Sequence, residues 1–327
     1  MPDGEIDLSG LEEPIMKSIT LDLSDKCSAK CDHCCLKCGP QNLNQLAEEK
    51  IESILLEIER YSWIEVVNIT GGEPFLNRPL LYKIFSKIMK MNKQATCITN
   101  GFWAVTEGDT YREIKKICSL GVTSLSISIS DFHQKYVPIK NIKNILNAAL
   151  QLPIRISLKI AVTETYNALE LIKNLGESIC DVSIMFFPVC QVGRAVNIQT
   201  EDIIKRYHGD MWMPCIDNNL LINSDGKCYP CCSPCIFETK LCVGNIYEED
   251  LGDIIERTRK NLLIYYLHKN GVTWIKELIE QKFGYHYPEY YVSPCELCLQ
   301  IFRYSDIIGK LVPVLKEYYE KDKVSEI

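Results

Sequence analysis

Basic residues are fewer than acidic ones in this sequence of 327 residues. It holds 36 Lys and Arg against 43 Asp and Glu and has a formal net charge of −7. Proteins that bind nucleic acid carry Lys and Arg clustered on a basic domain. The charge balance therefore argues against a nucleic-acid partner. Long apolar segments are also missing, since no run reaches the roughly 18 residues that a membrane-spanning helix needs.

The first residues lack the features of an export signal. Asp3, Glu5 and Asp7 lie where a signal peptide carries positive charge, and no apolar segment follows them. We therefore expect a cytoplasmic protein without a membrane anchor. With 46% hydrophobic residues, the chain can bury a large core and form one large domain and a smaller one.

Cysteine, in contrast, is abundant, with 17 residues. Without an export signal, cysteines are more often metal ligands or reactive thiols than disulfide partners. Five of them lie between Cys27 and Cys38, six between Cys215 and Cys242, and two at Cys295 and Cys298. The scattered remainder are expected to be small buried apolar side chains, namely Cys97, Cys118, Cys180 and Cys190.

The first part of the chain alternates short β-branched or apolar segments with longer amphipathic ones, which predicts βα units and a parallel sheet. The predicted strands are 18–23, 65–70, 95–99, 124–130, 154–162 and 181–187. The predicted helices lie near 44–60, 77–91, 109–120, 138–150 and 167–178. Six units are too few for an eight-stranded barrel, so we predict an α/β fold with a partial (β/α)6 barrel and a site at the carboxyl ends of its strands.

A second, smaller unit is expected after residue 192. Asp225-Gly226 lies between two short apolar segments and predicts a β-hairpin. Helices are predicted near 249–268, 271–283 and 301–320, with Cys295 and Cys298 in a loop before the last one. The expected domains are therefore 1–192 and 193–327.

The motif Cys27-x3-Cys31-x2-Cys34 follows the first predicted strand directly, so its three thiolates can converge on one side of a turn. Iron–sulfur clusters usually take four cysteines. Three ligands leave one iron open to a small molecule, whereas a structural zinc site would want four closed ligands.

This spacing resembles the signature of the radical S-adenosylmethionine (SAM) superfamily. The resemblance implies a 4Fe-4S cluster on Cys27, Cys31 and Cys34, with SAM bound to the open iron and cleaved to a 5′-deoxyadenosyl radical. Cys35 and Cys38 are expected to be structural thiols, because a fourth thiolate would block the iron that SAM needs.

A second motif, Thr70-Gly71-Gly72-Glu73-Pro74, follows the second predicted strand. The superfamily carries a GGE-type motif there, which contacts the amino group of SAM. Glycines permit a close backbone approach, and a carboxylate accepts hydrogen bonds from an ammonium group. The alternative is a Gly-Gly turn that only ends the strand.

Three further SAM contacts are expected to face the mouth at the strand ends: Asn100 after the third predicted strand, Ser128 on the fourth and Lys159 on the fifth. Lys159 lies in an apolar strand, where it would meet an anion such as the SAM carboxylate or form a buried ion pair. The resemblance places His33 against the adenine, and the alternative is an ordinary loop histidine.

The second cysteine group, Cys215-x10-Gly226-x4-Cys231 with Cys295-x2-Cys298, resembles the twitch form of the extensions that follow radical SAM cores. The resemblance implies an auxiliary 4Fe-4S cluster held by these four cysteines, closed and suited to electron transfer. A four-cysteine site can also hold zinc, which stays open as an alternative. The larger SPASM form would need cysteines after Cys298, and the sequence has none.

Adjacent cysteines in an extended segment point to opposite faces, so Cys231 and Cys232 cannot easily bind one cluster together. The segments YPCCSPCIFETK at 229–240, CDHCC at 31–35 and TNGFW at 99–103 resemble the radical SAM peptide epimerases of epipeptide (RiPP) biosynthesis. In that family the second cysteine of the pair donates a hydrogen atom, which implies this role for Cys232. The chain departs from the pattern in its extra thiols, which are Cys38, Cys228, Cys235 and Cys242.

We therefore expect a peptidyl epimerase, an isomerase that converts L- to D-residues in a ribosomally synthesised precursor peptide, with flavodoxin or ferredoxin as the reductant. Two alternatives stay open: a peptide cross-linking enzyme that forms thioether or C–C bonds, and an iron–sulfur electron carrier without a substrate. The first predicted strand begins at Ser18, which leaves no room before it for a leader-binding winged helix. We thus expect the peptide to be recognised by a cavity or by a partner protein.

Overall fold

The computed structural model describes residues 16–180 and 182–325. They form two compact units, which we call the core unit (18–204 and 222–225) and the extension unit (16–17, 205–221 and 226–325). The division after residue 204 falls later than the boundary expected at residue 192. The reason is that two 3-10 turns, Gly193–Asn197 and Thr200–Asp202, continue the core unit beyond its last strand.

Six parallel strands form the sheet of the core unit, and each pairs with the next one in the sequence. They are β1 (Ser18–Asp22), β2 (Val66–Thr70), β3 (Gln94–Thr99), β4 (Val122–Ile129), β5 (Arg155–Val162) and β6 (Ser183–Pro188). Residue 181, the expected start of the sixth strand, lies outside the described residues. The predicted parallel α/β architecture is therefore confirmed.

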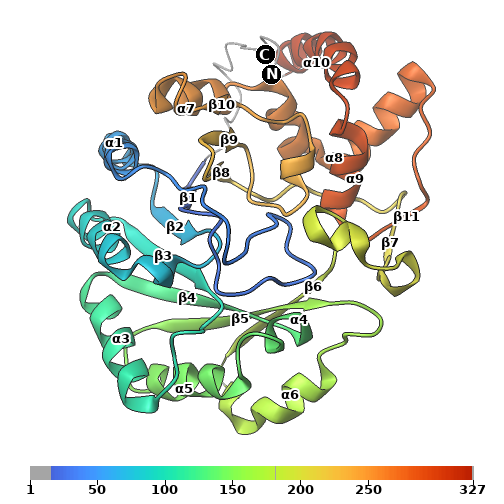
Figure 1. The fold of residues 1–327 in the computed structure, drawn as a ribbon. Coiled ribbons are helices and arrows are strands. Elements are labelled where there is room, and N and C mark those ends of the chain that lie inside the picture. Colours follow the sequence, from blue (N-terminus) through green and yellow to red (C-terminus); the bar gives the residue numbers. More distant parts are fainter. Residues whose placement is uncertain (1–15, 181, 326–327) are drawn as a thin grey trace. The chain divides into compact units, whose positions relative to one another are not determined.

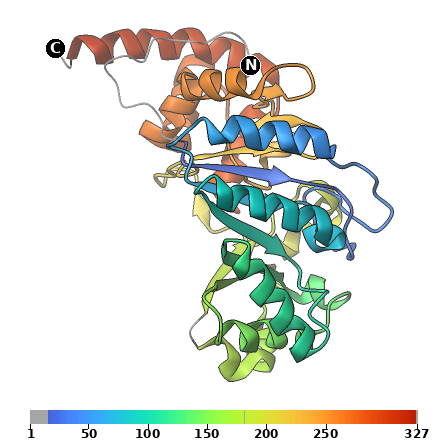
Figure 2. The same cartoon turned by 90° about the vertical axis from the view of Figure 1, so that its left-hand side faces the viewer.

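Helices cover one face of this sheet (Figures 1 and 2). They are α1 (Glu48–Glu59), α2 (Arg78–Lys90), α3 (Glu107–Ser119), α5 (Ile139–Ala149) and α6 (Leu169–Leu175). Side chains cap two of these helices: that of Asn77 accepts from Leu80 N at the start of α2, and that of Thr106 accepts from Asp109 N at the start of α3. A short helix that the sequence did not predict, α4 (Asp131–Gln134), follows β4.

The two faces of the sheet differ in polarity. On β4, Leu125, Ile127 and Ile129 are fully buried, and the serines between them are half-buried. Polar side chains on the second face bond from strand to strand, as in the Ser126–Ser157 contact of 2.9 Å between hydroxyl oxygens. This alternation follows from the two-residue period of a strand and gives the core unit a polar face without helices.

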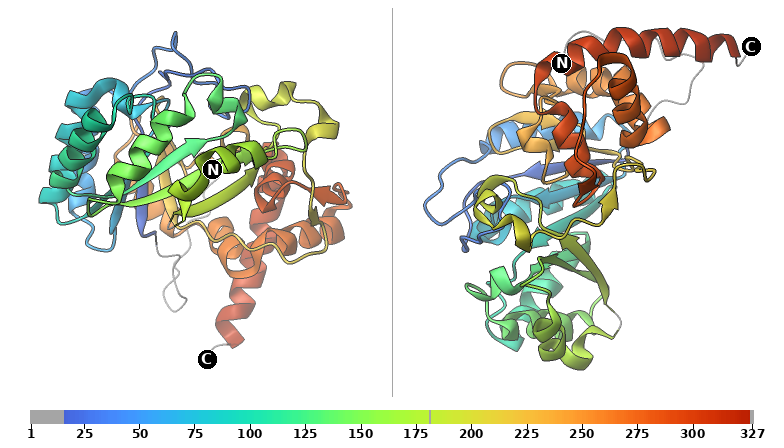
Figure 3. Two further views of the ribbon diagram at one scale, coloured as in Figure 1. Left: turned by 90° about the horizontal axis from the view of Figure 1, so that it is seen from below. Right: turned by 90° about the vertical axis from the view of Figure 1, so that its right-hand side faces the viewer.

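The extension unit contains the predicted hairpin and four helices. Its strands are β7 (Tyr207–His208), β8 (Asn219–Ile222, whose last residue belongs to the core unit), β9 (Lys227–Tyr229), β10 (Gly244–Asn245) and β11 (Tyr290–Tyr291). Its helices are α7 (Leu251–Arg259), α8 (Leu262–Phe283), α9 (Pro294–Phe302) and α10 (Ser305–Ser325), the last being the long C-terminal helix in Figure 3. No helix in the described part of the chain is long and apolar enough to cross a membrane.

The helix boundaries of the extension unit differ from the prediction. A break that the sequence does not predict lies at residues 260–261, where the side chain of Asn261 caps α8 by accepting from Leu263 N and Ile264 N at 3.1 Å. The break expected between residues 268 and 271 is found at Gly271, where α8 kinks and a non-helical φ of +84° suits glycine.

The predicted last helix, 301–320, corresponds to α10, and an unpredicted helix, α9, precedes it. Cys295 and Cys298 lie in α9, and not in a loop as expected. Ser293 caps this helix and Pro294 occupies its first turn, which explains why the helix begins before the cysteines. The three-residue spacing then places both thiols on one helix face.

Candidate active site

The loop between β1 and α1 carries the three cysteines of the first motif, and we call it the cluster loop (residues 23–47). Cys34 N donates to Cys31 O at 3.2 Å and Cys27 N donates to Gly39 O at 3.1 Å, so the loop folds back on itself. Burial raises the pKa of Cys27 to about 11 and that of Cys31 to about 12, and Cys34 lies near enough to add to both shifts. The three thiols are therefore neighbours, and Cys27 and Cys31 keep their protons until a metal displaces them.

Cys38 lies against Cys34 within the same loop. A hydrogen bond from the Cys38 thiol lowers the pKa of Cys34 to about 6, and Cys38 itself is buried. Hydrogen bonds to ligand sulfur atoms tune the potential of iron–sulfur clusters. Cys38 is thus placed as a donor to Cys34, in keeping with its expected structural role.

Arg194, which follows the last strand of the core unit in the sequence, holds the cluster loop in place by hydrogen bonds. Its Nε donates to Cys31 O at 2.8 Å, its Nη2 to Cys38 O at 2.6 Å and its backbone N–H to Cys34 O at 3.0 Å. Gly193 makes this approach possible, since a Cβ there would lie 2.2 Å from the carbonyl oxygen of Cys35. The sequence analysis missed Arg194, because nothing local in Gly193-Arg194 links it to a loop 156 to 163 residues away.

Asn100, at the end of β3, faces a cysteine of the first motif. Its Nδ2 lies 3.6 Å from Cys27 Sγ and 3.0 Å from Ser28 Oγ. A side-chain amide that donates to sulfur fits a site for a thiolate-bound cluster. The predicted strand-end position of Asn100 therefore brings it to the cluster loop.

Glu73 is buried and joins the ends of two strands. Its Oε1 accepts from Thr99 Oγ1 at 2.7 Å and from Phe75 N at 3.1 Å, while Oε2 accepts from Asn100 N at 2.8 Å. Burial raises the pKa of Glu73 to about 7, although these hydrogen bonds act to lower it. Oε2 retains a lone pair, so this arrangement leaves room for one further donor.

The two glycines before Glu73 pack against the cluster loop. Gly72 N donates to Ser24 O at 2.5 Å, and a Cβ on Gly72 would lie 2.1 Å from Lys26 O. Glycine is therefore required here for contact between two loops. Pro74 is buried at the start of the 3-10 turn that follows.

Asp22 ends β1 next to the cluster loop and is fully buried. Neither of its carboxylate oxygens has a hydrogen-bond partner within residues 16–180 and 182–325. Burial raises the pKa of Asp22 well above its usual value, and the charges of Asp25 and Cys34 act in the same direction. A buried acid that keeps its proton has a hydrogen to donate, which fits a site for a bound group.

His33 belongs to an aromatic cluster beside the loop. Its ring centroid lies 4.8 Å from that of Phe132 and 4.9 Å from that of His133. Burial lowers the pKa of His33 to about 4, so the ring is neutral at pH 7. The two other predicted contacts, Ser128 and Lys159, are paired neighbours on β4 and β5 and are half-buried.

A cavity of about 510 Å³ opens next to this cluster in the core unit. Phe132 and Tyr166 line it, with ring centroids 4.6 Å apart, as do Asp32 and Arg194 from the surroundings of the cluster loop. The rest of its wall comes from 164–165, 197–199 and 201–202. The cavity combines aromatic faces with carboxylates and amides, as binding sites for small molecules commonly do.

Four cysteines of the second group come together in the extension unit. Cys215 lies near Cys231, Cys295 and Cys298, close enough for their charges to shift one another's pKa. Burial is the largest cause of these shifts and raises the pKa of Cys215 to about 11. Within the described residues, no three His, Cys, Asp or Glu side chains are grouped so as to hold a single metal ion.

The adjacent cysteines Cys231 and Cys232 differ in their surroundings. Cys231 packs against the apolar core of the extension unit, whereas Cys232 is exposed. Asp217 Oδ2 accepts from Cys232 N at 2.9 Å and from Cys232 Sγ at 3.2 Å. The sequence analysis did not single out Asp217, although it lies only two residues after Cys215.

The remaining cysteines differ in how far they are buried. Cys228 and Cys235 are buried, and the Cys242 thiol donates to Gly244 O at 3.3 Å. Of the scattered group, Cys97 is buried, but Cys118 and Cys190 are only half-buried and Cys180 is exposed. The expected burial of Cys180 is wrong, because it follows the 3-10 turn Gly176–Ile179, which has no buried residue.

Two family models match the chain. The Radical SAM superfamily model matches residues 21–188, and the SPASM model, an iron–sulfur cluster-binding domain, matches residues 214–271. The second match includes Cys215 and Cys231 and ends before Cys295. The twitch form with one four-cysteine site therefore stays a prediction.

Individual proteins resemble the chain along most of its length. YydG of Bacillus subtilis (strain 168), whose name assigns it to peptide biosynthesis, is 32% identical over 313 residues, which are 94% of this chain and 98% of that protein. The crystal structure of BtrN with AdoMet and 2-DOIA has a TM-score of 0.52 at 13% identity and covers 80% of this chain and 90% of its own. The structure of anSMEcpe with AdoMet and the Cp18Cys peptide has a TM-score of 0.51 at 11% identity, with coverage of 92% and 99%.

The two solved structures share the fold of this chain at low identity, whereas the family model and YydG match its sequence. One family model spans half of the chain and the B. subtilis relative aligns with nearly all of it. The chain therefore belongs to the radical SAM superfamily, and it uses a 4Fe-4S cluster and S-adenosylmethionine together with further iron–sulfur chemistry in its extension unit.

Proposed function

We propose that this enzyme is a peptide epimerase, which inverts L-residues of a ribosomally synthesised peptide to D-residues. The observation that carries the proposal is the exposed thiol of Cys232, held by Asp217 beside the group of Cys215, Cys231, Cys295 and Cys298. The name of the relative YydG supports a peptide as the substrate. Inversion needs a hydrogen donor separate from the group that removes the hydrogen, and an exposed thiol outside a cluster site meets that need.

The core unit supplies the radical. In our proposal Cys27, Cys31 and Cys34 hold the 4Fe-4S cluster, and SAM bound to it supplies a 5′-deoxyadenosyl radical. The chain's own residues position these groups: Asn100 donates to Cys27 Sγ, and Arg194 holds the carbonyls of the loop. The neutral ring of His33 lies in the aromatic cluster beside the cavity, where a nucleobase can stack.

Polar groups of the core unit fit the charged end of SAM. In our proposal Glu73 Oε2 accepts from the SAM ammonium group, and Lys159, which pairs with Ser128 across β4 and β5, meets its carboxylate. Gly71, Gly72 and Pro74 set the backbone that holds Glu73 in place. The assignment of Glu73 rests on its position after β2, and that of Lys159 on its position within β5 beside Ser128.

The extension unit supplies the hydrogen. The four grouped cysteines fit a closed auxiliary cluster, which supplies electrons when bound. Cys232 gives its hydrogen atom to the carbon radical of the substrate and becomes a thiyl radical. One electron and one proton restore the thiol, and a reductant such as flavodoxin or ferredoxin provides the electrons.

An incubation in D2O tests the proposal. The anaerobically reconstituted enzyme, dithionite and SAM are combined with a synthetic peptide encoded by a short open reading frame beside the gene. We expect a mass gain of about one unit per modified residue and a D-amino acid after hydrolysis, because the thiol hydrogen exchanges with solvent. A product that has lost two hydrogens identifies cross-linking instead and contradicts epimerisation.

Arg194 gives a second prediction. In Arg194→Ala the cluster loop loses two side-chain hydrogen bonds, and partners that orient metal ligands contribute about 10- to 100-fold to metal affinity. We therefore expect faster loss of iron from the core unit to a chelator, by at least about tenfold, measured by iron content and by EPR of the reduced enzyme. Arg112→Ala, which removes an exposed arginine paired with Asp109, is the control. Equal iron loss in the two variants would refute the role of Arg194.

A further inference from the structure

Cys232 lies in an irregular segment and donates two hydrogen bonds to one neighbouring atom. No helix or strand includes residues 230–235. Asp217 Oδ2 accepts from both the backbone N–H and the thiol of Cys232, at 2.9 Å and 3.2 Å. A single oxygen therefore restrains both the main chain and the side-chain rotamer of this exposed residue.

Asp217 lies among residues that together line a small cavity. Asp217 lines a small cavity of about 20 Å³ together with Asn218, Pro230 and His268 of α8. Burial lowers the pKa of His268, and the negative charge of Asp217 opposes that shift, so the two side chains lie close together.

We propose that Asp217 is the positioning residue for the Cys232 thiol, a role that rests on the proposed epimerase function. Hydrogen transfer needs the reacting atoms about 3 to 3.5 Å apart, and a misplacement of about 1 Å costs roughly 10²-fold in rate. The thiol hydrogen turns toward the substrate by rotation about Cβ–Sγ, while the bond from Cys232 N keeps the residue in place. The C–H bond forms as the S–H bond breaks, and Asp217 neither gains nor loses a proton.

Two substitutions of Asp217 distinguish its role in positioning Cys232 from any role of its negative charge. Asp217→Ala removes the acceptor, whereas Asp217→Asn keeps a carbonyl oxygen that can take both bonds. The enzyme is reconstituted and supplied with SAM, dithionite and the peptide of the neighbouring reading frame. The ratio of 5′-deoxyadenosine to D-residue is then measured, together with hydrogen–deuterium exchange of segment 229–234 in the absence of substrate.

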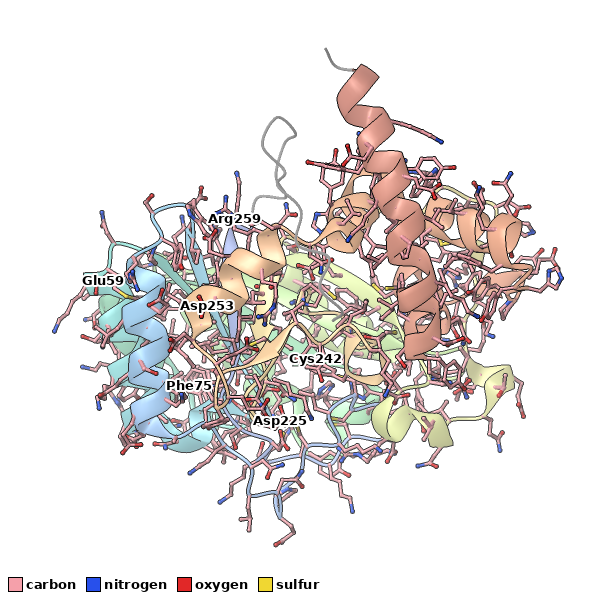
Figure 4. The ribbon with its side chains drawn as sticks, turned by 90° about the horizontal axis from the view of Figure 1, so that it is seen from above. Glu59, Phe75, Asp225, Cys242, Asp253 and Arg259 are labelled. Carbon is pink, nitrogen blue, oxygen red and sulfur yellow. The ribbon has the colours of Figure 1, made fainter. Side chains whose placement is uncertain are left out.

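We expect the alanine variant to make 5′-deoxyadenosine at the wild-type rate but at least about tenfold more of it per D-residue. Transfer from the misplaced Cys232 thiol then becomes slow, so that fewer substrate radicals end as inverted residues. Amide exchange in 229–234 should also become faster. The asparagine variant should resemble the wild type in both measurements, and Asp253→Ala, which removes an exposed carboxylate on α7 (Figure 4), is the matched control.

Three results would overturn the inference. They are a wild-type ratio in the alanine variant, an equal defect in the asparagine variant, and loss of iron from the alanine variant. The second would show that the charge or proton of Asp217 matters, and the third that it supports the cysteine site. Absence of D-residue from the wild-type enzyme itself is a different outcome, which removes the proposed function and with it the role of Asp217.

Discussion

Cys31→Ala is expected to reduce the formation of 5′-deoxyadenosine from SAM by at least about 10²-fold. The side chain is buried between Cys27 and Cys34, and burial keeps its pKa near 12 without a metal. The loss of even an outer partner of a metal ligand costs about 10- to 100-fold, and removal of a ligand costs more. The measurement is 5′-deoxyadenosine by liquid chromatography from the reduced enzyme and SAM, with no peptide present.

Two control variants make this result specific to the motif. Cys180→Ala replaces an exposed cysteine outside both groups and should cleave SAM like the wild type. Cys38→Ala removes the hydrogen bond to Cys34 but no proposed ligand, so its activity should fall by no more than about tenfold. If Cys31→Ala cleaved SAM normally, or Cys38→Ala failed as completely as Cys31→Ala, the assignment of the three ligands would be wrong. If the wild-type enzyme itself formed no 5′-deoxyadenosine, the electron-carrier alternative would be favoured.

Features encoded by short stretches of sequence were predicted well. The strands of the core unit were recognised because each is a short β-branched segment followed by an amphipathic helix, and the hairpin because Asp225-Gly226 has a turn conformation, with φ of +86° at Gly226. The first motif could be located for the same reason, since its three cysteines lie in one loop. Such features depend on local periodicity and local turn chemistry.

Features that depend on distant contacts were missed. Arg194 acts on carbonyl groups more than 150 residues away, and its hydrogen bonds use backbone atoms, which every residue type has. The role of Asp217 likewise follows from a contact with Cys232 across 15 residues. The helix that carries Cys295 and Cys298 is a different case, because its start depends on the local cap Ser293-Pro294 and not on a distant contact.

The largest effect on product formation is expected for Cys232→Ala. In the proposed mechanism this variant still forms 5′-deoxyadenosine, because the core unit is unchanged, but the yield of D-residue falls by at least about 10²-fold. Deuterium from D2O should no longer enter the peptide at the inverted position. Chiral analysis of the hydrolysed peptide and its mass, measured beside the 5′-deoxyadenosine yield, check both parts of the expectation.

Cys232→Ser tests the chemistry of the donor separately from its shape. Serine keeps a donor to Asp217 Oδ2 in nearly the same volume, but its O–H bond is stronger than S–H and does not give its hydrogen to a carbon radical. The serine variant should therefore fail like the alanine variant while the exchange of segment 229–234 stays as in the wild type, because the bond from residue 232 N to Asp217 is kept. If either variant produced D-residues at the wild-type rate, the hydrogen would come from elsewhere. If either instead retained a product with two hydrogens fewer, the enzyme would be a cross-linking catalyst, for which the exposed thiol of Cys232 is not required.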